Sequence, residues 1–351
     1  MEGIPIMGRK QKSEQLKESQ DSFLDAIVEK FGDNVLSNLR GDKVEAMTTG
    51  SLSLDACIGI GGLPKGRFTL IYGPEGSCKT TTALSTSLKE IENGGKVLYV
   101  DAENMLSYAT IEQMLGKFID KSKLLLIQPE TAEQAFMIIE KAITSHEFTL
   151  IVIDTIAALE PQEEKDKEFD ENTMMATPRL MSKFFRRNAA DVKNANVAVL
   201  LLNQIRDDTK SYMGGYKSTG GHALLHYSSV IIAFTKGVEI KQGEDKIGVN
   251  ARFVVKKNKM GAPFRSFEIP MIFGRGVDYH TDVVSFCETL GVIQKSGSHY
   301  KFEGVVIGQG RNAAAEYLRN NPETLDRMIN LLYNVMNKQP ELIEEEGAVD
   351  E

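Results

Sequence analysis

Residues 73–80, GPEGSCKT, have the types and spacing of a phosphate-binding loop. They match the pattern G-x-x-x-x-G-K-[ST], except that Cys78 stands in place of the second glycine. Backbone N–H groups would cradle phosphate oxygens, Lys79 would span the β- and γ-phosphates of a nucleotide, and the Thr80 hydroxyl would bind Mg²⁺. The alternative is an ordinary glycine-containing turn before a helix. The predicted nucleotide contacts of the loop are Gly73, Pro74, Glu75, Gly76, Ser77, Cys78, Lys79, Thr80 and Thr81.

Cys78 raises the question of whether this loop still works. A side chain at a position that requires positive φ costs about 1–2 kcal/mol, whereas a helix-like φ would cost little. The backbone amide remains in both cases, so we expect nucleotide binding to be retained. A helix start beside Lys79 would also lower the pKa of the thiol and open it to alkylation when nucleotide is absent.

Three apolar runs end in polar residues that could complete a hydrolytic site. Asp154 ends one run and is expected to hold Mg²⁺ together with Thr80. Glu103 follows another run and could orient or deprotonate an attacking water, while Gln204 follows a third, where its amide could detect a γ-phosphate. Each alone could be an ordinary polar strand end. Because ligands gather at the carboxyl ends of strands in open α/β sheets, the three together predict ATP hydrolysis.

Apolar runs alternating with longer segments predict an α/β core around these residues. The strand-like runs end at Val100, Ile127, Ile153 and Leu202, and the segments between them are long enough for crossover helices. This order predicts a mostly parallel central sheet covered by helices on both faces. Further β-rich stretches follow at residues 229–234, 251–257 and 266–273.

The two ends of the chain differ from this core. Residues 13–39 are predicted to be helical, with an apolar stripe that needs a partner. Beyond about residue 280 the chain is α-rich, with helices expected at 311–320 and 323–336. The stripe consists of Phe23, Leu24, Ile27, Val28 and Phe31. The predicted domains are an N-terminal helical segment (1–45), to which the family resemblance described below assigns oligomerisation, an ATPase core (46–280), a small C-terminal domain (281–340) and an acidic tail (341–351).

The net charge of −8 is concentrated in the tail. Residues 341–351 carry six acidic groups and no basic ones, which leaves −2 for the rest of the chain. Such a run is ordinarily a solvated terminus, and competition with DNA for a basic surface is the alternative. The overall charge therefore does not exclude a nucleic-acid partner.

Basic residues form two groups that could bind nucleic acid. A helix predicted to start at Thr177 carries basic residues on one face, at Arg179, Lys183, Arg186 and Arg187. Residues 205–221, which follow Gln204 directly, contain basic residues and two tyrosines that suit a DNA backbone with stacked bases. A solvated helix face and a mobile loop are the alternative. Because this loop leaves from the predicted phosphate sensor, nucleotide could change its conformation.

Composition and spacing argue against several other classes of protein. Three widely spaced cysteines support neither a disulfide framework nor a C-x-x-C metal site. His222 and His226 have i, i+4 spacing but lack the glutamate of a zincin motif, so two unrelated helix histidines are the favoured interpretation. No apolar run approaches the roughly 20 residues of a membrane span and no signal-peptide core is present, so we expect a soluble, cytoplasmic protein without a membrane partner.

The order of these motifs resembles the bacterial RecA recombinase family over roughly residues 20–335. The resemblance implies an ATP- and Mg²⁺-dependent homo-oligomer, a helical filament on single-stranded DNA that pairs it with a homologous duplex and exchanges strands. The most specific stretches are TGSLSLD (49–55), GGLPKGR (61–67), GPEGSCKTT (73–81), YVDAEN (99–104), VIDTIAAL (152–159), LNQIR (202–206), STGGHAL (218–224), KKNKMGAPF (256–264) and IGQGRNAAAEYLRNNPET (307–324).

The resemblance also implies roles for individual positions. Two DNA-binding loops fall at about 163–174 and 205–219, and the C-terminal domain matches the region where duplex DNA first binds. Lys257 and Lys259 match lysines that reach ATP on the neighbouring subunit. The implied catalytic residues are Lys79, Glu103, Gln204, Lys257 and Lys259. The implied DNA-binding residues are Met174, Arg179, Arg186, Arg206, Tyr212, Met213, Ser218, Thr219, Gly220 and Gly221.

Departures from the family pattern indicate a divergent member, for which a phage origin is one hypothesis. Cys78 replaces a glycine, and Leu225 stands where the family usually has another interface lysine. The family's adenine-stacking tyrosine has no aligned equivalent, and Tyr108 is the predicted substitute. The first DNA loop is acidic and the second is one residue shorter. Two other functions stay open: a ring helicase with the same core, and an ATP-gated DNA-binding scaffold with little hydrolysis.

Overall fold

The computed structural model describes residues 25–26, 29–30, 43–166, 176–207, 216–218 and 221–338. The chain divides into two compact units, residues 1–44 and 45–351. Of the predicted N-terminal helix, residues 25–26 and 29–30 are helical, and the rest lies outside the described residues, as does the acidic tail. No helix in the described part is long and apolar enough to cross a membrane.

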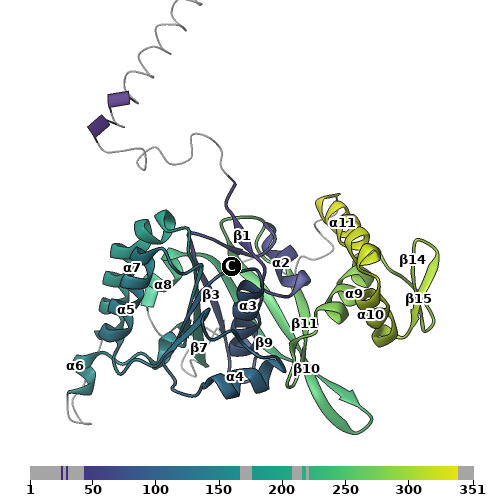
Figure 1. Ribbon diagram of the computed structural model, residues 1–351, viewed down its shortest axis with the longest axis horizontal. Helices are drawn as coiled ribbons and strands as arrows, with labels where there is room; N and C mark the ends of the chain where they lie inside the picture. The colour runs from purple at the N-terminus through teal and green to yellow at the C-terminus, as the bar shows by residue number, and fades with distance from the viewer. Residues whose placement is uncertain are drawn as a thin grey trace, which may run out of the picture. The chain divides into compact units, whose positions relative to one another are not determined.

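A ten-stranded sheet forms the centre of the second unit (Figure 1). Its strands are β3 (Phe68–Gly73), β4 (Val97–Asp101), β5 (Leu124–Ile127), β6 (Leu150–Asp154), β7 (Ala198–Asp207), β8 (Tyr216–Ser218), β9 (Ser228–Gln242), β10 (Asp245–Asn258), β11 (Ser266–Ile272) and β12 (Gly276–Val277). They follow the order β12-β11-β10-β9-β3-β7-β6-β4-β5, and β8 pairs with β7 outside this path. The strands from β9 to β5 pair in parallel, while β10, β11 and β12 continue antiparallel. The predicted mostly parallel sheet is confirmed.

Helices cover both faces of this sheet, as predicted (Figure 1). They are α2 (Leu52–Ile58), α3 (Lys79–Glu92), α4 (Tyr108–Leu115), α5 (Ala132–Ser145), α6 (Gln162–Lys165), α7 (Ala176–Asn194) and α8 (Gly221–Tyr227). Successive strand residues point to opposite faces, so Val97 and Tyr99 of β4 join one apolar cluster while Leu98 and Val100 join another. The first cluster contains side chains of α3 and α4, and the second contains side chains of α5, α7 and α8.

The hairpin of β9 and β10 is longer than the apolar pattern predicted. The expected strands ended at Phe234 and began at Ala251, but pairing continues to Gln242 and Asp245. In the extension the side chains are mostly exposed or half-buried, so no alternation of apolar residues marks it. Cross-strand contacts hold it instead, including an ion pair of 2.8 Å between Lys246 Nζ and Glu239 Oε1.

The C-terminal part (residues 279–338) combines helices with a small sheet. The helices are α9 (Tyr279–Thr289), α10 (Arg311–Asn320) and α11 (Pro322–Lys338), and the strands are β13 (Gln294–Ser296), β14 (His299–Phe302) and β15 (Val305–Gln309). The two predicted helices match α10 and α11 closely, whereas α9 and the three-stranded sheet were not predicted. These strands are too short for a clear periodic signal. Gly297 and Gly304, both at positive φ, form the turns between them.

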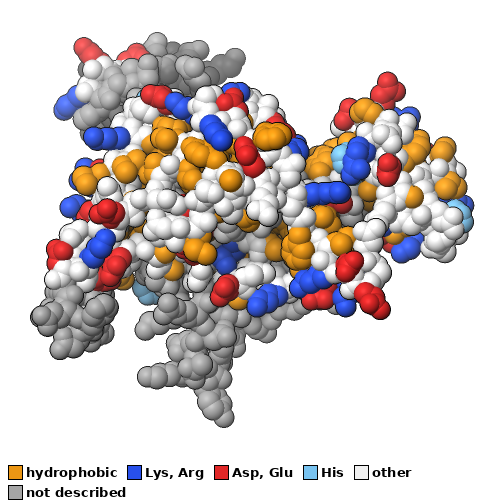
Figure 2. All heavy atoms as spheres, turned by 60° about the horizontal axis from the view of Figure 1, so that its bottom comes forward, with side chains coloured by type: hydrophobic (Ala, Val, Ile, Leu, Met, Phe, Trp, Pro, Cys, Tyr) orange, Lys and Arg blue, Asp and Glu red, His pale blue; other side chains and the backbone are white. Residues whose placement is uncertain are grey.

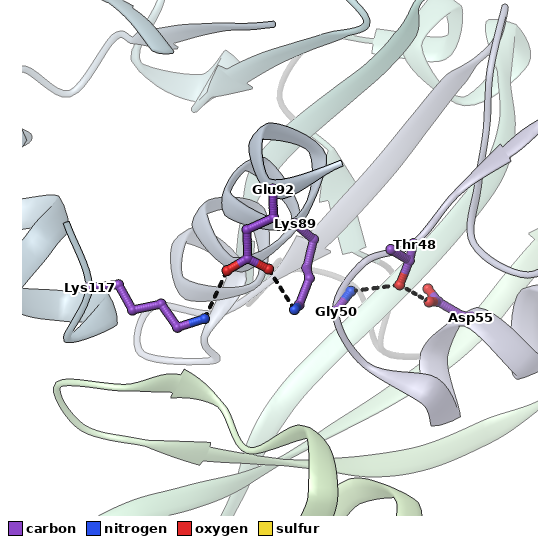
Figure 3. A network of polar contacts seen from close by, with 6 residues as sticks. All are labelled: Thr48, Gly50, Asp55, Lys89, Glu92 and Lys117. Atoms are coloured by element: carbon purple, nitrogen blue, oxygen red, sulfur yellow. Dashed lines mark hydrogen bonds and ion pairs between the residues drawn. The ribbon is translucent and has the colours of Figure 1, made fainter. Parts of the chain in front are cut away.

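Buried polar contacts join α2 to α9, and we call this cluster the seam. Asp282 Oδ2 accepts hydrogen bonds from Ser51 Oγ at 2.8 Å and from the Ser53 backbone N–H at 3.1 Å. Asp55 accepts from the Thr49 backbone N–H at 2.8 Å and from the Thr48 hydroxyl (Figure 3). Burial raises the pKa of Asp55 to about 7 and that of Asp282 to about 6. The seam therefore attaches the C-terminal part to the core through Asp282, while Asp55 holds the segment before α2 within the core.

The remaining short elements lie before the phosphate-binding loop or beside the sheet. β1 (Ala46–Met47) pairs antiparallel with β2 (Leu63–Pro64), and a 3₁₀ turn, η2 (Ile156–Ala158), follows β6.

Candidate functional site

The loop from Gly73 to Thr80 connects β3 to α3, in the strand–loop–helix order that phosphate binding requires. A Cβ on Gly73 would lie 2.3 Å from the Phe234 carbonyl oxygen, so only glycine fits there. The Lys79 side chain is buried and its Nζ donates to the carbonyls of Gly73 at 2.9 Å and Pro74 at 2.8 Å. Burial lowers its pKa, while the nearby Asp154 carboxylate acts in the opposite direction. The lysine is thus fixed within the loop and remains next to acidic groups.

Cys78 adopts φ 67° and ψ 22°, the left-handed conformation that favours glycine. The strained alternative considered from the sequence is therefore the observed one, and its cost is about 1–2 kcal/mol. The backbone still turns correctly into α3, where Cys78 is the N-cap residue without a side-chain hydrogen bond. The expected lowering of the thiol pKa was wrong: burial raises it, and the Lys79 charge only partly offsets this.

Sheet pairing brings the predicted strand-end residues to one edge, which we call the strand edge. Gly73 of β3 pairs with Gln204 of β7, and Asp154 of β6 pairs with Asp101 of β4. Because β3, β7, β6 and β4 are consecutive in the sheet, their carboxyl ends form one row. The Gln204 side chain donates from Nε2 to Glu103 Oε1 at 2.8 Å. The predicted phosphate sensor and the predicted base are thus in direct contact.

Asp154 has the surroundings of a metal ligand. Its Oδ2 accepts a hydrogen bond of 2.7 Å from the Tyr99 hydroxyl, and its buried Oδ1 has no hydrogen-bond partner. Burial raises its pKa to about 6, while the hydroxyls of Tyr99 and Thr80 lower it. Mg²⁺ is usually held by one or two carboxylates together with substrate phosphates. The free carboxylate oxygen beside the Thr80 hydroxyl therefore fits Mg²⁺. Among the described residues, no group of three Asp, Glu, His or Cys side chains could hold a metal ion by itself.

Two residues of the strand edge were missed by the sequence reasoning. Tyr99 orients Asp154 from the neighbouring strand, and the Thr155 hydroxyl donates to Glu103 Oε1 at 3.2 Å. Thr155 directly follows the strand-end aspartate, so its hydroxyl was a detectable signal. Tyr99 was hidden inside an apolar run, and only the pairing of β4 with β6 reveals its role.

Tyr108, the predicted adenine-stacking residue, begins α4. Its hydroxyl donates to the Leu124 carbonyl at 3.0 Å, and the Lys121 ammonium lies 5.3 Å from its ring centre. These contacts fix the ring beside β5. Adenine stacking by Tyr108 stays a prediction.

Lys257 lies on β10 and Lys259 directly follows the end of that strand, close enough that the charge of Lys259 helps burial to lower the pKa of Lys257. Lys257 Nζ donates to the carbonyls of Leu225 at 2.6 Å and His226 at 3.3 Å, near the end of α8. Unpaired carbonyls at a helix C-terminus attract a cation. Within one copy, this lysine therefore stabilises the helix that follows the second predicted DNA loop, and its contact with a neighbouring subunit stays a prediction.

The first group of basic residues lies on α7, which is described from Ala176, so Thr177 falls inside its first turn. Arg179, Lys183 and Arg186 are exposed, and neither Arg179 nor Arg186 has an ion pair among the described residues. Arg187 instead pairs with Glu140 of α5 at 3.3 Å. The available cations of the stripe are therefore Arg179, Lys183 and Arg186.

The second predicted DNA loop is partly a strand pair. β7 continues beyond Gln204 to Asp207, and Arg206 pairs with Lys217 of β8. Ser218 ends β8 and Gly221 begins α8. Met174, Tyr212, Met213, Thr219 and Gly220 lie outside the described residues. A short ladder of backbone hydrogen bonds therefore connects the sensor strand to the second DNA loop.

Comparisons with known proteins match nearly the whole chain. The family model described as the RecA N-terminal domain matches residues 18–278, and that of the RecA C-terminal domain matches residues 281–338. The chain is 38% identical to protein RecA of Thermus aquaticus over 323 residues, covering 90% of this chain and 93% of that protein. It is 35% identical to protein RecA of Bifidobacterium breve over 337 residues, covering 95% and 84%.

A solved structure, the crystal structure of the RadB recombinase, has a similar fold. It superposes with a TM-score of 0.51 at 23% identity, covering 66% of this chain and 98% of that chain.

Proposed function

The chain belongs to the RecA family, and we propose that its strand edge hydrolyses ATP under the control of single-stranded DNA. As a RecA-type recombinase it is a DNA-dependent ATPase that uses ATP with Mg²⁺, binds single-stranded and duplex DNA, and forms homo-oligomeric filaments. The observation that carries the proposal is the 2.8 Å hydrogen bond between Gln204 and Glu103. It connects the catalytic group to the strand that leads into the second DNA loop.

Each residue of the strand edge has a separate role in the proposed mechanism. The loop amides and Lys79 hold the phosphates. Asp154 and Thr80 would hold Mg²⁺, which neutralises phosphate charge when bound. Glu103 orients the attacking water and accepts its proton. These roles favour catalysis over a scaffold without hydrolysis, because the full set of acid, amide and lysine is present.

Gln204 couples the two ligands in this proposal. Its amide donates to Glu103 and can instead donate to a γ-phosphate, which would free the carboxylate for water. The same strand continues to Asp207 and pairs with β8. A change at Gln204 therefore reaches the second DNA loop along a continuous hydrogen-bonded strand, and DNA bound there would act on Gln204 in return.

The filament supplies the remaining groups. We propose that Lys257 and Lys259 reach the ATP of a neighbouring copy and that Lys257 leaves the α8 carbonyls to do so. The apolar stripe of residues 23–31 is the proposed contact with an adjacent copy. The domain boundaries predicted from the sequence stay part of this proposal. Arg179, Arg186 and the second loop are the proposed DNA contacts. We also propose a cytoplasmic location, which is the host cytoplasm if the gene is phage-encoded.

The test is ATP hydrolysis with and without saturating single-stranded DNA, with Lys79→Ala as the control. We expect DNA to stimulate hydrolysis and the control to abolish it, because no other group in the loop replaces the buried ammonium. Absence of turnover in both conditions, with ATP still bound, would support the scaffold function instead.

A further inference from the structure

A cavity of about 320 Å³ lies away from the strand edge, where the C-terminal part meets α3 and α4. Its lining includes four Lys or Arg residues and one histidine, with Asp278 as the acidic member. Leu115 and Val277 provide apolar surface. The basic residues are Lys89, Lys117, Arg275, His280 and Arg319. Figure 2 shows Lys and Arg side chains on both sides of the indentation between these parts of the chain.

The charges around this cavity do not cancel. Glu92 pairs with Lys89 at 2.7 Å and with Lys117 at 2.9 Å, as Figure 3 shows. One carboxylate thus holds two ammonium groups in place and neutralises one of them. Within the described residues, neither Arg275 nor Arg319 forms an ion pair or a side-chain hydrogen bond. The four Lys and Arg side chains around the cavity face only two carboxylates, those of Glu92 and Asp278. Two positive charges are therefore not balanced.

The rim that carries Arg275 is fixed by close backbone packing. Gly274 and Gly276, on either side of it, have φ of 70° and 72°. A Cβ on Gly276 would lie 2.8 Å from Ser85 Oγ of α3, and one on Gly116 would lie 2.3 Å from the Gly274 carbonyl oxygen. The turn therefore sits against the core with no room for larger residues. The packing fixes the backbone from which the Arg275 side chain extends, although ordering that exposed side chain on an anion still costs entropy.

The pKa of His280 is affected by charged residues from several elements around the cavity. Burial lowers its pKa, the charges of Arg319 and Lys89 lower it further, and Asp278 raises it. Arg319 comes from α10 and Lys89 from α3, so residues far apart in the sequence act on one imidazole. An anion bound in the cavity would offset the charges of Arg319 and Lys89 at this imidazole.

We infer that this cavity is a second anion site, separate from the phosphate-binding loop, which takes a multiply charged phosphate ligand between Arg275, Arg319, Lys89 and Lys117. Guanidinium groups bind phosphate oxygens through paired N–H donors, and the ammonium groups add point charges. The volume accommodates more than one phosphate group. A ligand there contacts the core and the C-terminal part at once, and so holds them together.

The first experiment measures binding of tripolyphosphate by calorimetry to the full chain saturated with MgADP, so that the phosphate-binding loop is already filled. We expect saturable binding at one site. The variant Arg275→Gln/Arg319→Gln should bind on the order of tenfold more weakly or worse, because two charge-assisted contacts are lost. The matched control is Lys241→Gln/Arg327→Gln, which removes the same charge from exposed positions outside the cavity.

Two results would overturn the inference. One is the absence of saturable binding to the MgADP-saturated protein. The other is equal weakening in the cavity variant and the control, which would mean that the overall charge attracts the anion.

A second readout does not depend on the variants. The pKa of His280, followed by NMR and assigned with His280→Gln, should rise when tripolyphosphate binds, because the anion offsets the charges of Arg319 and Lys89. An unchanged pKa at saturating tripolyphosphate would contradict the proposed location.

Phosphate groups come from two sources, free polyphosphates or a nucleic-acid backbone, and competition distinguishes them. A short DNA duplex that displaces tripolyphosphate, and that binds the cavity variant more weakly than the control, assigns the site to the DNA backbone. A duplex that binds without displacing tripolyphosphate assigns it to a free polyphosphate such as that of a nucleotide. With either result, the cavity is a site that binds phosphate groups.

Discussion

The strand edge and the seam both bury carboxyl groups with raised pKa values, yet they differ in what surrounds those groups. Asp154 has a pKa of about 6 and lies beside Lys79, Thr80 and Glu103, at the ends of parallel strands. Asp282 also has a pKa of about 6, but hydroxyl and backbone N–H donors of α2 and its N-cap surround its Oδ2. A raised pKa alone therefore does not identify a catalytic group. Asp154 is a candidate metal ligand because it lies at the strand edge beside Lys79 and Thr80.

The largest effect that this difference predicts is on turnover at the strand edge. Glu103→Gln should lower the rate of ATP hydrolysis by about 10²–10⁴-fold, because the amide cannot accept a proton from water. ATP affinity should remain nearly unchanged. Steady-state hydrolysis and nucleotide titration check both expectations, with the exposed Glu130→Gln as the matched control. A Glu103→Gln protein that hydrolyses ATP at the normal rate would assign the base elsewhere.

At the seam the expected effect is on stability. Asp282→Ala leaves the Ser51 hydroxyl and the Ser53 N–H without their acceptor, so we expect the free energy of unfolding to fall by about 2 kcal/mol. Turnover per folded molecule should stay the same. Urea denaturation and hydrolysis assays on one preparation separate these quantities. Lost turnover in fully folded protein would show that the seam takes part in catalysis.

The raised pKa of Asp282 in the seam predicts how the free energy of unfolding changes with pH. The pKa of Asp282 in the folded protein, about 6, lies above the ordinary value of 3.8. Between these values the folded chain keeps a proton that the unfolded chain releases, so stability falls as pH rises from about 4 to 6. Asp282→Asn should flatten this decline by on the order of 1 kcal/mol per pH unit. Parallel denaturation curves at pH 4, 5 and 6 would show it, and an identical slope in the variant would place the titration on another group.

The smallest expected effect concerns the loop itself. Cys78→Gly relieves the left-handed backbone but adds freedom to the unfolded chain, so we expect a net gain of about 0.5 kcal/mol in stability. Cys78→Ala is the control, since it removes the thiol and keeps the strain. Thermal unfolding of both variants checks this. Equal stabilisation by alanine would mean that the thiol, and not the backbone angle, is the source of strain.

The strand edge was predictable because its residues stand at the ends of apolar runs, and parallel pairing brings such ends together. Glu103, Asp154 and Gln204 were found in this way, and helices α10 and α11 by their periodicity. The seam was not predictable, because Ser51 and Asp282 are 231 residues apart and neither belongs to a local pattern of charge. The conformation of Cys78 was undecided because the residue types of the loop left both a left-handed and a helix-like φ open at that position.

Gln204 is proposed to couple the nucleotide to the second DNA loop. The most direct test is ATP hydrolysis by Gln204→Ala with and without saturating single-stranded DNA, with DNA binding measured in the same samples. We expect the wild type to be stimulated by DNA and the variant to bind DNA and ATP but hydrolyse at one low rate in both conditions. Stimulation of the variant to the same extent as the wild type would contradict coupling through Gln204.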